Sequence, residues 1–222
     1  MDLRRSLLTE HERLGSRRRR SIFSRRAGSV KKNAMSALFS RPPRVRGLRL
    51  LRVARRFDGA PSHRGKLIAG TLVLPCAIGR AGVTRAKREG DGATPAGRLR
   101  LLQLLLRPGR AAACAIPSRF IRPDDLWCDD PASFSYNHPL RAPTKLGHER
   151  LWRDDRLYDV VGVLDYNIRP RALGRGSAIF FHIATLDLGP TAGCVALRAR
   201  DMARLLPRLA RGVRIAIDQP FE

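Results

Sequence analysis

Short apolar runs, separated by glycine, proline and charged residues, fill the chain from residue 46 onward. Each run is rich in valine, isoleucine, leucine or aromatic residues and ends in a turn signal, which is typical of β-strands rather than of long helices. The predicted strands are Leu48–Val53, Lys66–Ala77, Arg98–Leu105, Leu157–Tyr166, Ala178–His182 and Val213–Ile217. This pattern predicts a mainly β domain built from sheets.

One segment has helical spacing instead. Its apolar positions are Met202, Leu205, Leu206 and Leu209. They share one face of a predicted helix, with Asp201 in its first turn and Gly212 available as a stop. Pro207 is expected to end or kink this helix early, because proline cannot donate a helical hydrogen bond.

Charge is distributed unevenly along the 222 residues, whose formal net charge is +25. Residues 1–56 contain 18 lysines and arginines against 3 acidic residues, whereas the rest contains 26 against 16. Basic clusters such as Arg17–Arg20 interrupt any apolar periodicity, so residues 1–45 are predicted to form a basic, disordered arm. Residues 46–218 are long enough to form one domain with its own core.

The sequence of the basic arm does not identify its partner. Lysine and arginine clusters can bind nucleic acid, but Phe23 and Phe39 are the arm's only aromatic residues, so platforms for base stacking are missing and nucleic acid is disfavoured. Attraction to anionic lipid or an envelope polymer fits the charge equally well. The alternatives are a solvated arginine bias without a partner, or a natural start nearer Met35.

Targeting signals are not visible in this sequence. No stretch near the start has the roughly 7–15 apolar residues of a signal-peptide core, and no run of about eighteen apolar residues predicts a transmembrane anchor. These patterns alone favour a cytoplasmic location.

Four cysteines lie at wide, irregular spacings: Cys76, Cys114, Cys128 and Cys194. This is not a disulfide framework for a chain of this size. Cys114 and Cys128, taken with His138 and His148, lack the close pairs in which zinc ligands usually occur, so neither a metal nor another cofactor is predicted.

One histidine and one cysteine form a candidate catalytic pair. His182 ends a predicted strand, and eleven residues separate it from Cys194, which follows Gly193. A cysteine needs such a neighbour because the thiolate is the nucleophile and an imidazole can take its proton. Glycine permits a tight turn that aims backbone N–H groups of Gly193 and Cys194 at an oxyanion. The alternative is packing of a buried cysteine near a histidine.

A second motif lies upstream, where Thr94-Pro95-x-Gly97 precedes an apolar strand. A Thr-Pro-x-Gly turn, a strand ending in histidine and a Thr/Ser-x-Gly-Cys-Val/Ile loop occur in this order in the L,D-transpeptidase catalytic domain, the YkuD-like family. The chain resembles this family over about residues 46–218. The resemblance implies a sandwich-like fold, a periplasmic or cell-wall location, Cys194 as nucleophile and His182 as base.

Several positions depart from the pattern of this family. Ala192 stands where many members have histidine, and Ala196 where many have arginine. Ile183 follows the base histidine where glycine or serine is common, and the spacing to the cysteine is short. The chain therefore resembles a compact, divergent member, with the pair retained.

The irregular segment from Pro123 to His148 is predicted to lie over the site. Tyr136 and Asn137 are expected to hydrogen-bond a substrate peptide, as is Thr191 beside the cysteine. The carboxylate pairs of this segment are Asp124-Asp125 and Asp129-Asp130. They could receive ammonium groups of a diamino acid or, alternatively, pair with Arg122 and Arg141 in a solvated acidic loop.

The predicted function is that of a cysteine acyltransferase acting on peptidoglycan stem peptides. Cys194 attacks the linkage to a terminal D-alanine and forms a thioester, which an amine acceptor converts to a crosslink or water hydrolyses. The helix after Cys194 would lower the thiol pKa if its N-terminal end faced the loop. The alternatives are a carboxypeptidase- or amidase-type cysteine hydrolase, and a non-catalytic basic module that binds wall or nucleic acid.

Overall fold

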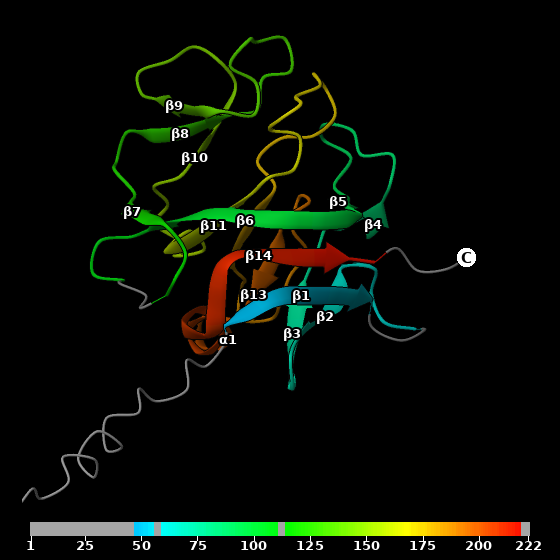
Figure 1. Ribbon diagram of the computed structural model, residues 1–222. Coiled ribbons are helices and arrows are strands. Elements are labelled where there is room, and N and C mark those ends of the chain that lie inside the picture. Colours follow the sequence, from blue (N-terminus) through cyan, green and yellow to red (C-terminus); the bar gives the residue numbers. More distant parts are fainter. Residues whose placement is uncertain (1–46, 56–58, 111–113, 219–222) are drawn as a thin grey trace, which may run out of the picture. The chain divides into compact units, whose positions relative to one another are not determined.

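A nine-stranded sheet carries most of the described chain (Figure 1). The computed structural model describes residues 47–55, 59–110 and 114–218. The strands of this sheet are β1 (Leu48–Arg55), β2 (Arg64–Ala69), β3 (Leu72–Ala77), β6 (Gly97–Leu106), β7 (Ser118–Phe120), β11 (Val160–Leu164), β12 (Phe180–Ile183), β13 (Val195–Leu197) and β14 (Leu209–Ile217). Their order is β11-β12-β13-β3-β2-β1-β14-β6-β7, and β6 also pairs with β11, so the sheet closes on itself. Its opposite parts face each other across a shared core, which confirms the predicted mainly β, sandwich-like fold.

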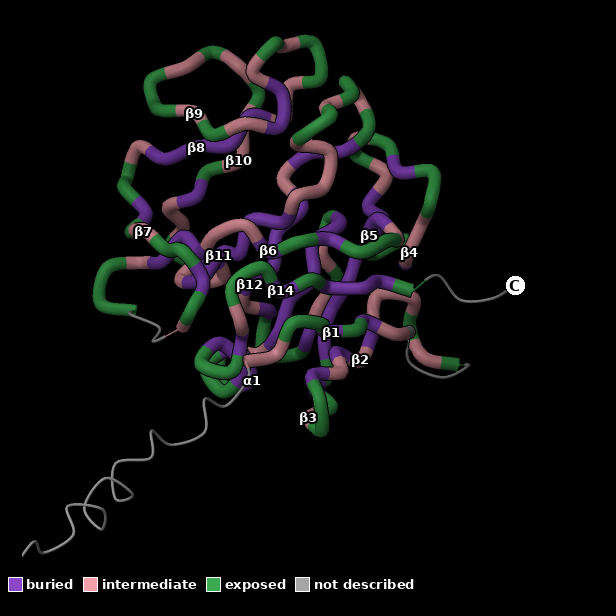
Figure 2. Tube along the Cα trace, viewed as in Figure 1, coloured by how far each residue is buried: buried purple, intermediate pink, exposed green. Residues whose placement is uncertain are grey.

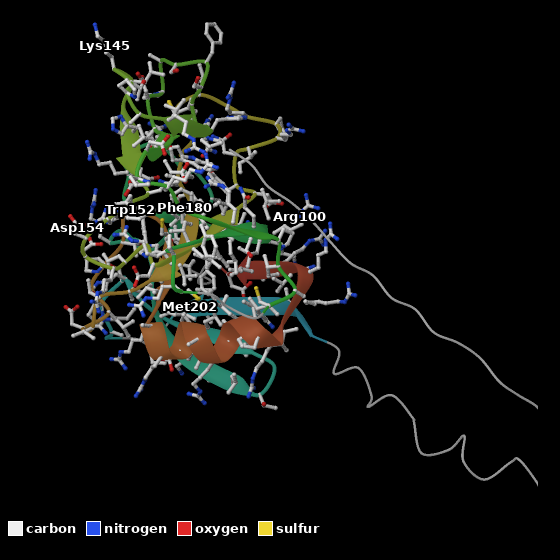
Figure 3. All side chains as sticks on the ribbon, turned by 90° about the vertical axis from the view of Figure 1, so that its left-hand side faces the viewer. Arg100, Lys145, Trp152, Asp154, Phe180 and Met202 are labelled. Carbon is white, nitrogen blue, oxygen red and sulfur yellow. The ribbon has the colours of Figure 1, made fainter. Side chains whose placement is uncertain are left out.

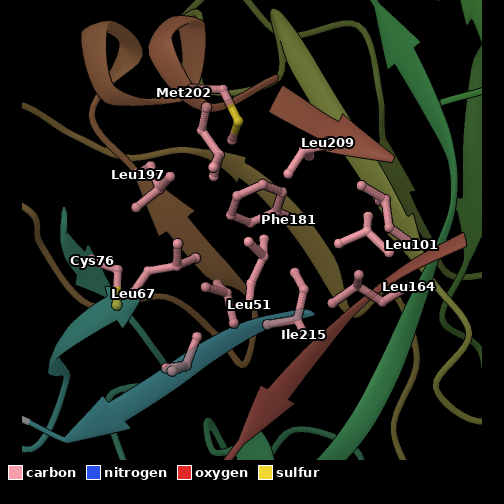
Figure 4. Packing of buried hydrophobic residues seen from close by; sticks show 14 of the residues in the cluster. Leu51, Leu67, Cys76, Leu101, Leu164, Phe181, Leu197, Met202, Leu209 and Ile215 are labelled. Carbon is pink, nitrogen blue, oxygen red and sulfur yellow. The ribbon is translucent and has the colours of Figure 1, made fainter. Parts of the chain in front are cut away.

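The core follows from the alternation of side chains along each strand. On β1, Leu51 and Val53 are buried whereas Arg52 between them is exposed. Figure 2 shows this alternation as purple and green along β1. Phe181 of β12 lies in the middle of the largest buried cluster, among leucine and isoleucine side chains from several strands (Figure 4). Burial of each such side chain contributes about 2 kcal/mol, so this cluster is the main source of stability.

The remaining strands of the described residues form two smaller sheets. The small sheet consists of β8 (Asp125–Cys128), β9 (Pro139–Arg141) and β10 (His148–Arg150), in the order β10-β8-β9. The other is a parallel pair, β4 (Val83–Thr84) and β5 (Thr94–Pro95). Figure 1 shows the small sheet above β6 and the helix α1 (Ala199–Leu205) below β1. Figure 3 shows the same arrangement from the side, with Lys145 at the outer end of the loops of the small sheet and Met202 on the helix at the opposite end.

The predicted helix is present but shorter than expected. The α-helix ends at Leu205 and continues as a 3₁₀ turn, η1 (Leu206–Arg208), before β14 begins. Pro207 lies in that turn. It has no N–H to donate, so the α-helix does not continue through this position. The prediction was therefore wrong for Leu209, which pairs with Leu48 of β1, and for Gly212, which lies within β14 instead of stopping the helix.

The predicted strands match the large sheet with two corrections. The run from Lys66 to Ala77 is not one strand but a hairpin, in which β2 and β3 pair antiparallel with Ala69 opposite Leu72. Gly70 begins the turn with a φ of 62°, a left-handed conformation that glycine adopts readily. The predicted strand Leu157–Tyr166 is shorter, because pairing covers only Val160–Leu164.

The predicted arm, residues 1–45, lies outside the described residues, so its disorder stays a prediction, as does the domain boundary. The described residues fall within one compact unit, Val45–Glu222. In this part of the chain, no helix has both the length and the apolar character needed to span a membrane.

Candidate active site

His182 and Cys194 come from neighbouring parallel strands. His182 lies on β12, and Cys194 directly precedes β13. In the pairing of these strands, Phe181 lies opposite Val195 and His182 opposite Ala196. The side chains of His182 and Cys194 line one pocket of about 290 Å³. The sheet register therefore brings the predicted nucleophile and base to the same cavity.

The thiol of Cys194 is held by the backbone that leads into β12. It donates a hydrogen bond to the carbonyl oxygen of Ala178 and accepts one from the N–H of Phe180, each at 3.2 Å. Ala178 has a φ of 49°, a left-handed conformation in which its carbonyl faces the sulfur. The Phe180 N–H favours the thiolate, because a hydrogen bond donated to a charged form stabilises that form.

The loop before the cysteine is closed by Thr191. Its hydroxyl donates to the carbonyl oxygen of Cys194 at 2.7 Å and accepts the N–H of Gly193 at 3.2 Å. The carbonyl oxygen of Thr191 accepts the N–H of Arg80 at 3.0 Å, which ties the loop to the end of β3. The N–H of Gly193 is thus bonded within the loop when no substrate is present.

The Thr-Pro-x-Gly motif packs directly against this loop. The fully buried hydroxyl of Thr94 accepts the N–H of Gly79 at 2.8 Å and donates to the carbonyl oxygen of Cys194 at 3.5 Å. Gly193 has a φ of 144°, and a Cβ there would lie 2.9 Å from the carbonyl oxygen of Ala93. Only glycine fits this position, so the loop before Cys194 packs closely against the backbone that precedes Thr94.

The imidazole of His182 is oriented by a backbone carbonyl. Its Nδ1–H donates to the carbonyl oxygen of Ile183 at 2.8 Å. Because a carbonyl oxygen can only accept, Nδ1 carries the proton, and the unprotonated Nε2 has the lone pair that a base needs. A carboxylate partner is therefore not required for this histidine.

Burial shifts both members of the pair toward their neutral forms. It lowers the pKa of His182 to about 4 and raises the pKa of Cys194 to about 12. The Phe180 N–H and the Lys87 ammonium lower the cysteine pKa, and Glu149 raises it further, but burial is the largest cause. The hypothesis that the following helix lowers this pKa finds no support, since the pKa of Cys194 is raised. At neutral pH the resting pair is a thiol and a neutral imidazole.

The comparison with protein families agrees with this geometry. The family model described as YkuD, L,D-transpeptidase catalytic domain, matches residues 63–217. The chain belongs to this family. Neither the curated proteins nor the solved structures gave a match. The match spans Thr94, His182 and Cys194, so the resemblance predicted from these motifs is confirmed.

Two alanines distinguish this L,D-transpeptidase domain from the pattern of many members. Ala192 lines the pocket, where a small side chain leaves space beside the thiol. Ala196 is fully buried in an apolar cluster with Ala77, Ala184 and Leu188. Neither position carries a polar side chain.

Charged side chains line the rest of the L,D-transpeptidase pocket: Arg80, Lys87, Glu89, Asp129, Glu149 and Arg153. Several of them are paired within the protein. Lys87, although buried, bonds Asp91, and Glu89 accepts the hydroxyl of Ser177 at 2.8 Å. Burial and then the nearby Glu89 raise the pKa of Asp129. The pocket therefore has both signs of charge around Cys194.

The carboxylate pairs predicted to bind ammonium groups divide between two roles. Asp124 and Asp125 bond Arg141, and Asp125 also bonds Arg119, so this pair belongs to the predicted network with surrounding arginines. Asp129 lines the pocket, whereas Asp130 accepts the N–H of Ala132. That one of these carboxylates binds a substrate stays a prediction. Of the four, Asp129 is the one that lines the pocket.

The three residues predicted to bind substrate also differ in position. Thr191 lines the pocket. Tyr136 is fully buried, and its hydroxyl donates to Glu89. Asn137 is buried as well and bonds four groups of the protein, including the N–H of Ala178 at 3.1 Å. Contact of these residues with a substrate stays a prediction. Tyr136 and Asn137 hydrogen-bond Glu89 and Ala178, which line the pocket.

Three further residues of the pocket around His182 and Cys194 were not predicted from the sequence. Tyr158, Glu149 and Lys87 line the pocket but belong to no motif of the chain. The cysteines outside the pocket are free thiols: Cys76, Cys114 and Cys128. Among residues 47–55, 59–110 and 114–218, no group of three His, Cys, Asp or Glu side chains is placed to hold a metal ion.

The raised pKa of Cys194 predicts an unusual pH dependence of its alkylation. Iodoacetamide reacts with the thiolate, so the rate at Cys194 should rise with pH up to about pH 12 rather than level off near pH 9. At pH 7 the shift from 9 to about 12 lowers the thiolate fraction about 1,000-fold relative to an unperturbed thiol. Peptide mass spectrometry of alkylated protein measures the rate at each cysteine.

Cys114 is the internal control for this experiment, since it is only half-buried and lies outside the pocket. Its alkylation should be faster than that of Cys194 at every pH below 9. A plateau of Cys194 alkylation at or below pH 8 would show that the resting thiol is not neutral.

Proposed function

We propose that this protein is an L,D-transpeptidase that acts on peptidoglycan stem peptides through a thioester on Cys194. The observation that carries the proposal is the pocket shared by Cys194 and His182, in which Nδ1 of His182 is protonated and Nε2 keeps its lone pair. Membership of the family supports the reaction class, and the Thr94 and Thr191 bonds to the Cys194 carbonyl support a preorganised nucleophile loop.

The neutral resting pair determines the order of proton transfers. The sulfur of Cys194 attacks the carbonyl carbon between the third residue of the stem and its terminal D-alanine while Nε2 of His182 takes the thiol proton. The imidazolium then gives this proton to the leaving amine, the C–N bond breaks and a thioester remains. An amine acceptor, activated by the same imidazole, forms the crosslink and restores the thiol.

The oxyanion of each tetrahedral intermediate needs hydrogen-bond donors. The N–H groups of Gly193 and Cys194 are the proposed donors, each worth on the order of 3 kcal/mol of transition-state stabilisation. Gly193 bonds Thr191 in the resting state, so its N–H must be shared or released when substrate binds. This makes Thr191 a neighbour of the reacting atoms, in agreement with its place in the pocket.

The remaining parts of the proposal concern partners and location. The acyl donor is a stem peptide, the acceptor is an amine, and no metal or other cofactor takes part in these steps. Family membership supports a periplasmic or cell-wall location. The basic arm, residues 1–45, is proposed to contact an anionic envelope polymer or lipid, since its charge favours both over an uncharged partner.

Intact-protein mass spectrometry tests this function. Wild type and Cys194→Ala are incubated with disaccharide-tetrapeptide fragments, and we expect a thioester adduct and released D-alanine with wild type alone. Dimeric products identify crosslinking, whereas tripeptide products without dimers identify the hydrolase alternative. Absence of any adduct and product under reducing conditions would contradict the proposal and favour a binding module.

A further inference from the structure

The imidazole of His182 packs against an aromatic side chain that the mechanism above does not use. The ring of Tyr158 lies edge-on to the imidazole, with 5.2 Å between the centroids and 73° between the planes. Tyr158 also contacts the ring of Phe180, with the centroids 6.0 Å apart. Phe180 and His182 are alternate residues of β12, so Tyr158 covers the face of this strand that leads to the pocket.

A carboxylate from another sheet holds Tyr158 in place. The Tyr158 hydroxyl donates to Oε1 of Glu149 at 3.0 Å, and Arg153 donates to the same oxygen at 3.3 Å. The guanidinium of Arg153 also lies over the Tyr158 ring, 5.0 Å from its centroid. Glu149 belongs to β10 of the small sheet, so Tyr158 links that sheet to the base.

The small sheet contacts β12 a second time through Trp127. Trp127 of β8 lies opposite Glu149 of β10. Its ring packs edge-on against Phe180, with 5.3 Å between the centroids. Trp127 therefore packs directly against Phe180. Glu149 reaches His182, two residues further along the same face of β12, through Tyr158.

The hydrogen bond to Ile183 fixes the tautomer of His182, and the edge-on contact with Tyr158 adds a further restraint on the ring. We propose that Tyr158, tethered by Glu149, is a positioning residue that fixes the imidazole plane of His182 so that Nε2 faces the thiol of Cys194. This inference rests on the proposed function, in which His182 is the base. A misplaced base is costly, since a displacement of about 1 Å can slow a reaction about 100-fold.

A double-mutant cycle separates the tether from general effects on folding. Tyr158→Phe keeps the ring and removes the hydroxyl, whereas Glu149→Ala removes the acceptor. Each should lower kcat for thioester formation about tenfold with KM unchanged, and the double variant should lose no more than either single variant, because all three lack the same bond. Tyr166→Phe is the matched control, since its hydroxyl donates to the carbonyl oxygen of Arg175 and Tyr166 does not line the pocket, so kcat should not change.

Glu149 has a second effect that an additional variant isolates. Its charge raises the pKa of Cys194, after the larger effect of burial. Glu149→Gln keeps an oxygen for the Tyr158 hydroxyl but removes the charge, so Cys194 should be alkylated faster at pH 8, and kcat should fall less than in Glu149→Ala. A role limited to folding would not produce this separation of alkylation from turnover.

A titration of the His182 ring signals by NMR tests the inference without any substrate. Tyr158→Ala opens the wall over the imidazole, so the His182 pKa should rise from about 4 toward 6.5, because burial is the largest cause of its lowering. Arg153 and Asp155 also act on His182, with opposite signs, and remain in this variant. Tyr158→Phe should leave this pKa unchanged.

The outcomes decide the inference independently of the proposed function. If wild type forms no thioester, the proposed function fails, and the titration and alkylation still report on the contact of Tyr158 with His182. Additive losses in the cycle, or an unchanged His182 pKa in a folded Tyr158→Ala variant, overturn the positioning role. If Tyr158→Ala does not fold, the cycle decides the question alone.

Discussion

Replacing His182 by asparagine should lower the rate of thioester formation at pH 7 about 1,000-fold or more. The pKa of Cys194 is about 12, so without a base only about one molecule in 100,000 carries a thiolate at this pH. The variant should regain about tenfold in rate for each unit of pH, as hydroxide takes over deprotonation, whereas wild type should depend weakly on pH between 6 and 9. Rapid-quench mass spectrometry of a single turnover measures both rates.

His63→Asn is the matched control for this variant, because His63 contacts Arg64 and does not line the pocket. It should react at the wild-type rate. Thioester formation by His182→Asn at the wild-type rate at pH 7 would exclude His182 as the base, even if Cys194 is the nucleophile.

Replacing Asn137 by alanine should lower the free energy of unfolding by about 4 kcal/mol. The amide oxygen accepts the Trp127 indole N–H at 2.9 Å and the Ala178 N–H, and the amide nitrogen donates to the carbonyl oxygens of Tyr166 and Asn167. Alanine leaves these four groups without their partner, and each unsatisfied buried group costs about 1–3 kcal/mol. Urea unfolding followed by far-UV circular dichroism measures the change.

We also expect Asn137→Ala to change the reactivity of Cys194. The carbonyl oxygen of Ala178 accepts the hydrogen bond of the Cys194 thiol, and the amide oxygen of Asn137 accepts the N–H of Ala178. Loss of this amide therefore frees the residue that orients the sulfur. Phe134→Ala on the same loop is the control, since that ring is 94% exposed and its removal should change stability by less than about 0.5 kcal/mol. A loss below 1 kcal/mol in Asn137→Ala would mean that water or neighbouring groups replace its bonds.

The candidate pair and the strands around it could be predicted because their signals are local. An apolar run that ends at His182 is enough to predict β12, and Gly193 beside Cys194 marks a loop that tolerates no side chain. The Thr94 motif could be placed near them only through a family resemblance, since no spacing rule connects residues a hundred positions apart. The structure supplies the physical connection, a hydrogen bond from Thr94 to the carbonyl oxygen of Cys194.

Other features could not be predicted because they depend on tertiary contacts. Asn137 was expected to hydrogen-bond a peptide, and it does bond peptide groups, but those of its own chain. Tyr158 follows no motif, and its importance arises only when β10 and β12 bring Glu149 and His182 to either side of it. The hairpin at Gly70 was missed for a simpler reason, since the apolar run continues on both sides of a turn with one glycine.

The buried state of Cys194 has a consequence for resistance to oxidation. Hydrogen peroxide oxidises thiolates, and Cys194, a residue that is 7% exposed and has a pKa of about 12, offers almost no thiolate at neutral pH. Cys114 is more accessible than the buried Cys76, Cys128 and Cys194, and it lies outside the pocket. We therefore expect oxidants to damage Cys114 before Cys194. Under the proposed mechanism the sulfur of Cys194 becomes an anion only when His182 takes its proton, so we expect this thiol to persist without a reducing system.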